Sequence, residues 1–292
     1  MNTPIFHAAS LVIENGIAEF THNHPASRNA MSTALRADYA RMLDAVAADG
    51  SVRALILRGA GGSFCAGGDL HEMADRLRDP AEGSPAATRR RIGASAPWLR
   101  RLLELDAIVI AAVEGPAAGA GFSLALHADL VIASQDARFS MSFPRIGAVA
   151  DFGAHYLLPR IVGLSAARGI LLTGRTLDAR EARALGIVHA LHPAGRLTQA
   201  AHALAQQICR GPADALAMSK RLLNLSFDTD YATMANMEAL SQAVAMAAPV
   251  HRDAVRRFVE KQAQSYDWDR DGQATGLGRR AGVTPSVTPG GR

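Results

Sequence analysis

The chain has 292 residues, of which 49% are hydrophobic and 20% are charged. These proportions are ordinary for a globular protein and allow one large domain, or one domain with a smaller appendage. The formal net charge of +4 is too small to indicate a nucleic-acid-binding protein. No run approaches the ~20 apolar residues that a membrane-spanning helix requires, so neither nucleic acid nor a membrane is expected as a partner.

The cysteines and the first residues bear on the compartment. Cys65 and Cys209 do not suggest a disulfide framework and fit a reducing cytoplasm. The stretch Met-Asn-Thr-Pro-Ile-Phe-His lacks the pattern of a signal peptide. Residues 22–24 combine two histidines with an asparagine, but no further metal ligand follows at a suitable spacing. We therefore expect a cytoplasmic protein without a metal site.

The N-terminal elements begin with a hairpin. Strand-like runs at 11–14 and 17–22 flank Asn15-Gly16, a dipeptide typical of tight hairpin turns. A helix is expected over 32–48, because apolar residues recur there on one face. The run 54–57, Ala-Leu-Ile-Leu, is typical of a buried strand.

Strands and helices continue to alternate over the middle of the chain. We predict helices from about residue 69, over 87–105 and over 118–127, and strands over 108–113, 129–134 and 139–143. This alternation indicates an α/β protein built from repeated β-β-α units.

Beyond Pro159 the pattern is mainly helical. A lone strand is expected over 187–191, with helices over 212–225, 230–247 and 251–264. From residue 271 the chain is rich in Gly, Pro and Thr and has hardly any apolar periodicity. We expect a core over 1–200, a helical region over 201–270 and a disordered tail over 271–292.

A glycine-rich loop follows the strand at 54–57. Residues 58–70 are Arg-Gly-Ala-Gly-Gly-Ser-Phe-Cys-Ala-Gly-Gly-Asp-Leu. Glycines let backbone N–H groups approach a ligand closely. Asp69-Leu70 is expected to open a helix, whose free N–H groups favour negative charge. Phe64, a large apolar residue among the glycines, suggests that the loop is anchored.

The stretch 63–70 resembles the first oxyanion-hole segment of the enoyl-CoA hydratase/isomerase (crotonase) family, Phe-x-Ala-Gly-x-Asp-[Leu/Ile]. In that family a backbone N–H of this segment binds the thioester carbonyl of an acyl-CoA, and the resemblance places this donor at Ala66. It also implies a crotonase-like spiral of β-β-α units, with a helical C-terminal region that packs in a homotrimer or a dimer of trimers.

A second segment resembles the same family. Residues 113–124 are Val-Glu-Gly-Pro-Ala-Ala-Gly-Ala-Gly-Phe-Ser-Leu, and the resemblance places the second N–H donor at Ala120. Two fixed donors stabilise an enolate oxygen without reorganisation, and losing one typically costs about 3 kcal/mol of barrier. Packing of small residues between a helix and a sheet is the structural alternative. The order and spacing of the two segments favour the functional interpretation.

The stretch 139–163 is the longest match, and it contains Asp151, where isomerase-like members carry an acid. The run 258–261 resembles the family's last helix, in which Phe258 and Lys261 reach the CoA of a neighbouring subunit. The resemblance implies further CoA contacts from the backbone of Ser27, Arg28, Ala66, Gly67, Gly68, Asp69 and Leu70. Arg28 is a candidate for meeting a CoA phosphate. CoA is then part of the substrate, and no permanently bound cofactor is implied.

Two positions depart from the hydratases of the family. Those enzymes carry two glutamates that activate water, and the corresponding residues here are Ser123 and Phe143. Neither side chain can replace a carboxylate base. One carboxylate suffices to move a proton between two carbons, so the sequence favours double-bond isomerisation with Asp151 as acid/base. A hydratase with an unplaced acid and a non-catalytic acyl-CoA binder are the alternatives.

The acids also have structural interpretations. Asp151 could cap a helix over 152–158 and pair with His155, and Asp69 could cap the helix that it precedes.

A nucleophile elbow is a rival interpretation of the second segment. Residues 121–125 nearly match Gly-x-Ser-x-Gly, with Asp151 and His155 downstream in hydrolase order. However, Ser123 lies well beyond the strand that ends near Val113, and an Asp and a His four residues apart would be unusual triad partners.

Overall fold

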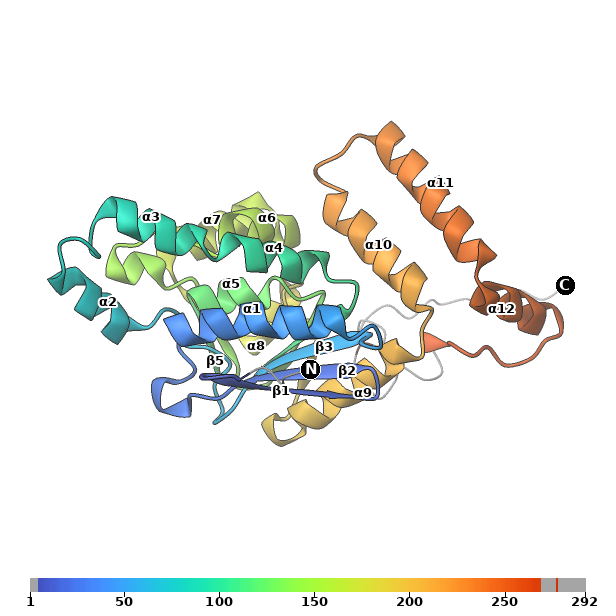
Figure 1. The fold of residues 1–292 in the computed structure, drawn as a ribbon, viewed down its shortest axis with the longest axis horizontal. Helices are drawn as coiled ribbons and strands as arrows, with labels where there is room; N and C mark the ends of the chain where they lie inside the picture. Colours follow the sequence, from blue (N-terminus) through green and yellow to red (C-terminus); the bar gives the residue numbers. More distant parts are fainter. Residues whose placement is uncertain (1–4, 269–276, 278–292) are drawn as a thin grey trace, which may run out of the picture.

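The computed structural model of the protein describes residues 5–268 and residue 277 (Figure 1). The predicted tail, 271–292, lies outside the described residues apart from Leu277. Within the described ranges, no helix combines the length and the hydropathy needed to cross a bilayer.

The described residues form two sheets, and the larger has the strand order β1-β2-β3-β4-β6-β9. Its strands are β1 (Ala9–Glu14), β2 (Ile17–His22), β3 (Ala54–Gly59), β4 (Ile108–Val113), β6 (Leu130–Ser134) and β9 (Ala190–His192). β1 and β2 form an antiparallel hairpin, and each later pair is parallel. The predicted hairpin is confirmed: Asn15 and Gly16 have φ values of 53° and 78°, which a tight turn requires.

Alternate residues of the parallel strands face opposite layers. Leu55 and Leu57 belong to the large core cluster that includes α1 (Thr33–Ala48), whereas Ile56 belongs to a second cluster with α9 (Leu197–Cys209). Figure 1 shows α1 and α9 on opposite sides of the sheet. Burial on both faces explains why this strand is a continuous apolar run.

The smaller sheet lies in the order β5-β7-β8. Its strands are β5 (Pro116–Ala118), β7 (Arg138–Ser140) and β8 (Thr176–Asp178). The other helices before residue 200 are α2 (Leu70–Arg78), α3 (Pro85–Gly93), α4 (Ala96–Glu104), α5 (Ala120–Ala125), α6 (Ala154–Val162), α7 (Leu164–Thr173) and α8 (Ala179–Ala184), and the 3-10 turns are η1 (Pro25–Ser27), η2 (Phe143–Ile146) and η3 (Ala194–Arg196).

Several predicted elements differ from the structure. The single helix expected over 87–105 is two helices, α3 and α4, and Pro97 lies in the first turn of α4, where its missing N–H is tolerated. The helix expected from residue 118 begins at Ala120, because the preceding residues form β5. The strand expected over 139–143 ends at Ser140, and Phe143 opens η2.

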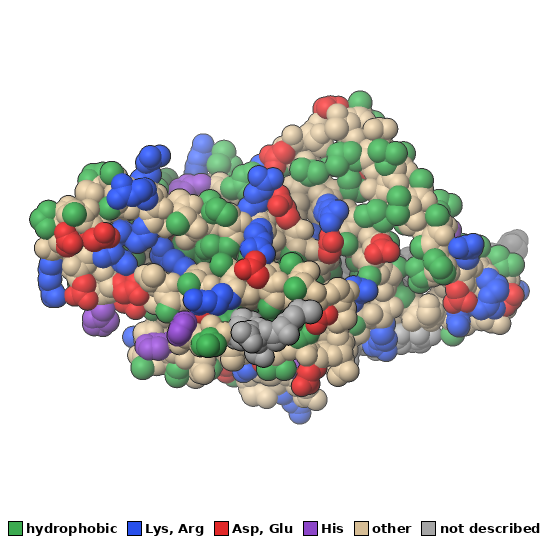
Figure 2. Space-filling view, in the orientation of Figure 1, with side chains coloured by type: hydrophobic (Ala, Val, Ile, Leu, Met, Phe, Trp, Pro, Cys, Tyr) green, Lys and Arg blue, Asp and Glu red, His purple; other side chains and the backbone are tan. Residues whose placement is uncertain are grey.

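Three C-terminal helices extend away from the body of the molecule (Figure 1). They are α10 (Ala213–Leu225), α11 (Tyr231–Ala247) and α12 (Pro249–Val259). Hydrophobic side chains gather over α10 and α11 in Figure 2, and Leu223 and Leu240 are 70% and 63% exposed. Exposed apolar surface of this kind marks an interaction surface.

Candidate active site

The first glycine-rich loop, residues 58–70, is held in place by hydrogen bonds from buried polar side chains. Asn29 donates from Nδ2 to the carbonyl oxygens of Ala60 and Ser63, at 2.8 and 2.6 Å. His22 Nδ1 lies 2.8 Å from the Phe64 carbonyl oxygen, and its Nε2 lies 2.6 Å from the Tyr39 hydroxyl. Because a carbonyl only accepts, Nδ1 carries the proton and Nε2 accepts from Tyr39. Burial lowers the pKa of His22 to about 4, so this ring is neutral at pH 7.

The two glycine-rich segments lie side by side because β3 and β4 are parallel neighbours whose carboxyl ends share one edge of the sheet. The Cys65 N–H donates to the Pro116 carbonyl at 3.1 Å, and the Ala118 N–H donates to the Cys65 carbonyl at 3.0 Å. A Cβ added at Gly121 would lie 2.2 Å from the Cys65 carbonyl oxygen. Glycine at 121 is therefore what allows the start of α5 to pack directly on the first loop.

The backbone donors of these segments are not all free. The Ala66 N–H, predicted as the first oxyanion donor, donates to the Arg28 carbonyl at 3.0 Å. This hydrogen bond removes Ala66 as a free donor. Within the described part of the chain, the N–H groups of Gly68 and Ala120 have no such partner. Ala120 is the first residue of α5, a position whose N–H cannot bond within the helix.

Asp151 lies in a strained turn before α6. Phe152, the next residue, has a φ of 52°, which is unusual for a residue with a bulky side chain, and it is buried against Trp98 with a ring separation of 5.5 Å. Such strain persists only where packing fixes the conformation, and it is common at functional sites. This packing fixes the position of the neighbouring Asp151.

The Asp151 carboxyl does not cap α6. The N-cap residue is Gly153, and the helix begins at Ala154 instead of the expected residue 152. Asp151 Oδ1 is buried and has no hydrogen-bond partner, and among the described residues no ion pair or hydrogen bond joins Asp151 to His155. Burial raises the pKa of Asp151 above its ordinary value, and the nearby Arg36 guanidinium lowers it.

The two positions that carry glutamates in hydratases are filled without a carboxylate. Ser123 is buried, and its hydroxyl donates to the carbonyl of Gly119, the N-cap of α5, at 3.2 Å. A Cβ added at Gly119 would lie 3.8 Å from the ring of Phe143, so this ring lies against the second segment. The buried Ser123 hydroxyl also disagrees with a nucleophile elbow, which would present it to a substrate.

The other residues predicted to contact CoA differ in their exposure and in their hydrogen bonds. Asp69 is the N-cap of α2 and accepts from the N–H groups of His71 and Glu72 at 2.9 and 3.1 Å, so its structural interpretation is confirmed. Arg28 is exposed with a φ of 52°. Phe258 is 77% exposed on α12, which lies far from α2 in Figure 1. Phe258 and Lys261 therefore do not reach the loops of their own chain.

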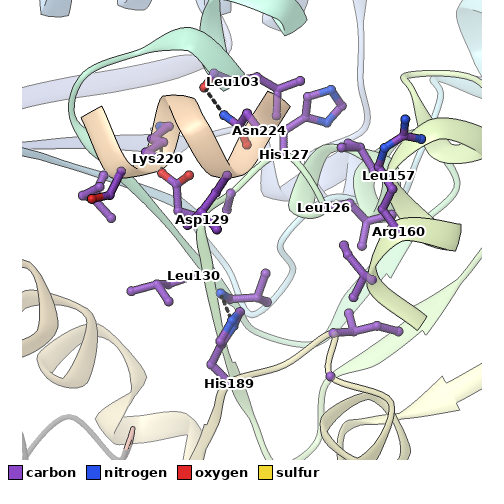
Figure 3. Close-up of a pocket in the computed structure, with 18 of the residues that line it drawn as sticks. Leu103, Leu126, His127, Asp129, Leu130, Leu157, Arg160, His189, Lys220 and Asn224 are labelled. Atoms are coloured by element: carbon purple, nitrogen blue, oxygen red, sulfur yellow. Dashed lines mark hydrogen bonds and ion pairs between the residues drawn. The ribbon is translucent and has the colours of Figure 1, made fainter. Parts of the chain in front are cut away.

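A cavity of about 550 Å³ lies apart from the two glycine-rich loops (Figure 3). It is lined by the first residues of β4 and β6 and by α10, which places it at the opposite end of the parallel strands from the two loops. Its wall holds a buried ion pair in which Lys220 Nζ lies 2.7 Å from Asp129 Oδ2. None of the predicted site residues lines it.

One residue at the site was missed by sequence reasoning. Arg36 lies on α1 beside the apolar positions that predict that helix, and its guanidinium carbon lies 5.4 Å from the centre of the Phe152 ring. A charged residue next to an apolar helix face is an ordinary boundary residue, so the sequence carried no signal for it.

The two adjoining loops, the parallel sheet and the outer helices together define an α/β protein of the crotonase fold. The family model for enoyl-CoA hydratase/isomerase matches residues 12–269. The chain therefore belongs to the enoyl-CoA hydratase/isomerase family.

Solved and curated relatives agree with this assignment. The crystal structure of an enoyl-CoA hydratase/isomerase from Cupriavidus metallidurans CH34 is 38% identical with a TM-score of 0.85, and the match covers 96% of this chain and 100% of the other. The 1,2-epoxyphenylacetyl-CoA isomerase of Escherichia coli K12 is 34% identical over 87% of this chain and 96% of its own length. The short-chain-enoyl-CoA hydratase of Clostridium acetobutylicum is 31% identical over 85% and 93% of the two chains.

Proposed function

We propose that this enzyme isomerises the double bond of an enoyl-CoA thioester, with Asp151 as the only acid/base. The observation that carries the proposal is the buried Asp151 oxygen without a hydrogen-bond partner, combined with Ser123 and Phe143 at the two hydratase positions. A carboxyl oxygen without a hydrogen-bond partner is available for a proton, and burial adjusts the pKa of the carboxyl group toward the working pH.

The mechanism needs one base and two donors. Asp151 takes a proton from the carbon between the thioester carbonyl and a 3,4 double bond, which leaves a dienolate with its negative charge on the thioester oxygen. The N–H groups of Gly68 and Ala120 stabilise that oxygen, and Gly68 replaces Ala66 as the first donor because the Ala66 N–H is already bonded. Asp151 then returns the proton two carbons away, and the product is the 2-enoyl thioester.

The remaining site residues bind the CoA part of the substrate in this proposal. The backbone of Ser27, Arg28 and 66–70 contacts CoA, while Phe258 and Lys261 serve the site of a neighbouring subunit in a homotrimer or dimer of trimers. The exposed apolar surface of α10 and α11 supports such an assembly. No permanently bound cofactor takes part.

The mass of the product tests the reaction type. Isomerisation of a 3-enoyl thioester leaves its mass unchanged, whereas hydration of a 2-enoyl thioester adds the mass of one water. We expect the purified protein to convert 3-enoyl to 2-enoyl thioesters and to hydrate the 2-enoyl product at least about tenfold more slowly, because two carboxylates are absent. Faster hydration would support the hydratase alternative, which the name of the Clostridium relative favours, and binding without turnover would support a non-catalytic binder.

The pH dependence tests the role of the carboxyl. Burial raises the pKa of Asp151, and only the ionised form removes a proton. We expect kcat/KM to fall as the pH decreases through this raised pKa, above the value of about 3.9 of an exposed aspartate. The measurement is kcat/KM against pH, with circular dichroism to show that the fold persists. A profile that stays flat down to pH of about 4 would contradict the assignment.

A further inference from the structure

Arg36, on α1, is a half-buried cation whose side chain has no hydrogen-bond or ion-pair partner among the described residues. Its Nε is buried and has no hydrogen-bond partner. A guanidinium has five N–H donors, and leaving a buried one unpaired is costly. The arrangement is therefore explained best by a ligand that supplies the acceptor.

The surroundings of Arg36 place that ligand at the acyl end of the site. The guanidinium lies 5.4 Å from the ring centre of Phe152, the residue after Asp151. Arg76 lies on α2, which begins directly after the first loop, and its Nε is also buried and without a partner while its Nη1 bonds Glu72 at 3.0 Å. A ligand group here would lie beside the proposed acid/base, Asp151, so we assign it to the acyl part of the thioester.

The local charge is suited to an anion. Arg76 is paired with Glu72, whereas Arg36 forms no ion pair within the described part of the chain and has Asp151 as the carboxylate with the largest electrostatic effect on it. Burial lowers the pKa of Arg36. The carboxylates of Asp151 and Glu72 raise this pKa, whereas the guanidinium groups of Arg76 and Arg91 lower it. Glu72 and Arg76 lie on α2, Arg91 lies on α3, and Asp151 lies in the turn before α6. Figure 2 shows both basic and acidic side chains over α2 and α3. Around Arg36 itself, the three cations Arg36, Arg76 and Arg91 meet the two anions Asp151 and Glu72, and this excess of one positive charge favours a negatively charged ligand group.

We propose that Arg36, with Arg76 beside it, binds a carboxylate carried by the acyl group, so that the preferred substrates are enoyl-CoA thioesters of dicarboxylic acids. A carboxylate accepts two parallel hydrogen bonds from a guanidinium, which is the geometry that an unpartnered arginine offers. The proposal rests on the proposed function, because it names the substrate class of the same site.

The test compares two substrates that differ only at the far end of the acyl chain. These are hex-3-enedioyl-CoA, which ends in a carboxylate, and hex-3-enoyl-CoA, which ends in a methyl group. A charge-assisted hydrogen bond predicts that the wild type favours the diacid in kcat/KM by about 10- to 100-fold. Arg36→Met should lower this ratio at least about tenfold. Arg78→Met, which removes an arginine that is 79% exposed on α2, is the matched control and should keep the ratio.

Two outcomes would overturn the inference. One is a wild type that shows no preference for the diacid. The other is an Arg36→Met variant whose kcat/KM falls by the same factor with both substrates and whose pH profile has its acid limb at higher pH. Arg36 would then act only by lowering the pKa of Asp151.

A binding measurement separates this inference from the proposed function. Calorimetry with the saturated pair, hexanedioyl-CoA and hexanoyl-CoA, reports the same preference without chemistry. If the protein converts both enoyl thioesters without a preference, the carboxylate site is overturned and the isomerase proposal stands. If it binds the saturated diacid more tightly but converts neither enoyl thioester, the carboxylate site is supported and the isomerase proposal is not.

Discussion

Replacing Asp151 by asparagine is expected to lower the turnover of a 3-enoyl thioester by about 100- to 10,000-fold, the usual contribution of a general acid/base. Asparagine has nearly the same shape, but it cannot accept or return a proton. The stability should change little, because Asp151 Oδ1 has no hydrogen-bond partner to lose. The measurements are kcat with the 3-enoyl substrate, the Kd of a saturated acyl-CoA and the melting temperature.

Asp178→Ala is the matched control for a purely structural aspartate. Asp178 caps α8 by accepting from the Glu181 N–H at 2.8 Å, so its loss should cost about 1 kcal/mol of stability and leave turnover intact. If Asp151→Asn shows that same pattern, Asp151 is a structural residue and the enzyme uses another base.

Much of the fold could be predicted because it depends on local signals. Asn15-Gly16 takes the two positive φ angles of a hairpin turn, and the run 54–57 is buried on both faces of a parallel sheet. The error over 87–105 was avoidable, because Pro97 marks the restart of a helix. The short strand β5 gave no local signal, since its pairing with β7 involves residues 22 positions further along.

The site was less predictable than the fold because it depends on contacts between distant segments. The sequence placed both glycine-rich segments, but it could not show that the Arg28 carbonyl occupies the Ala66 N–H and leaves that of Gly68 free. Likewise, the sequence cannot tell whether Asp151 caps a helix or acts as a catalytic carboxyl. The structure excludes the cap, because α6 begins at Ala154 and its N-cap is Gly153. Arg36 was overlooked because the lack of a partner is a property of the folded chain alone.

Strain and burial are concentrated at this site. Arg28 and Phe152, two residues with long or bulky side chains, adopt positive φ angles of 52°. Aromatic rings connect the two regions, because Phe64 contacts His22, which contacts Tyr39, whose ring stacks on Trp98, which packs on Phe152. The first loop and the turn that holds Asp151 are therefore parts of one packed unit, as a preorganised site requires.

The second large effect is expected at Ala120, where the backbone itself is the functional group. Proline is tolerated at the first position of a helix, because the N–H that it lacks has no partner within the helix. Ala120 is the first residue of α5, so Ala120→Pro removes the proposed oxyanion donor with little cost to the helix. We expect kcat to fall by about 100- to 1,000-fold, as on the loss of one oxyanion-hole donor.

Two variants make this prediction specific to the N–H group. Ala120→Gly removes the side chain but keeps the donor, so it should retain kcat within about tenfold. Leu164→Pro places proline at the first position of α7, where the leucine is 56% exposed, and it should leave both kcat and the melting temperature unchanged. Equal kcat values for Ala120→Pro and Ala120→Gly, at equal melting temperatures, would show that the Ala120 N–H does not bind the thioester oxygen. A loss confined to Ala120→Pro would instead support the enolate mechanism, because only the transition state places a full charge opposite that donor.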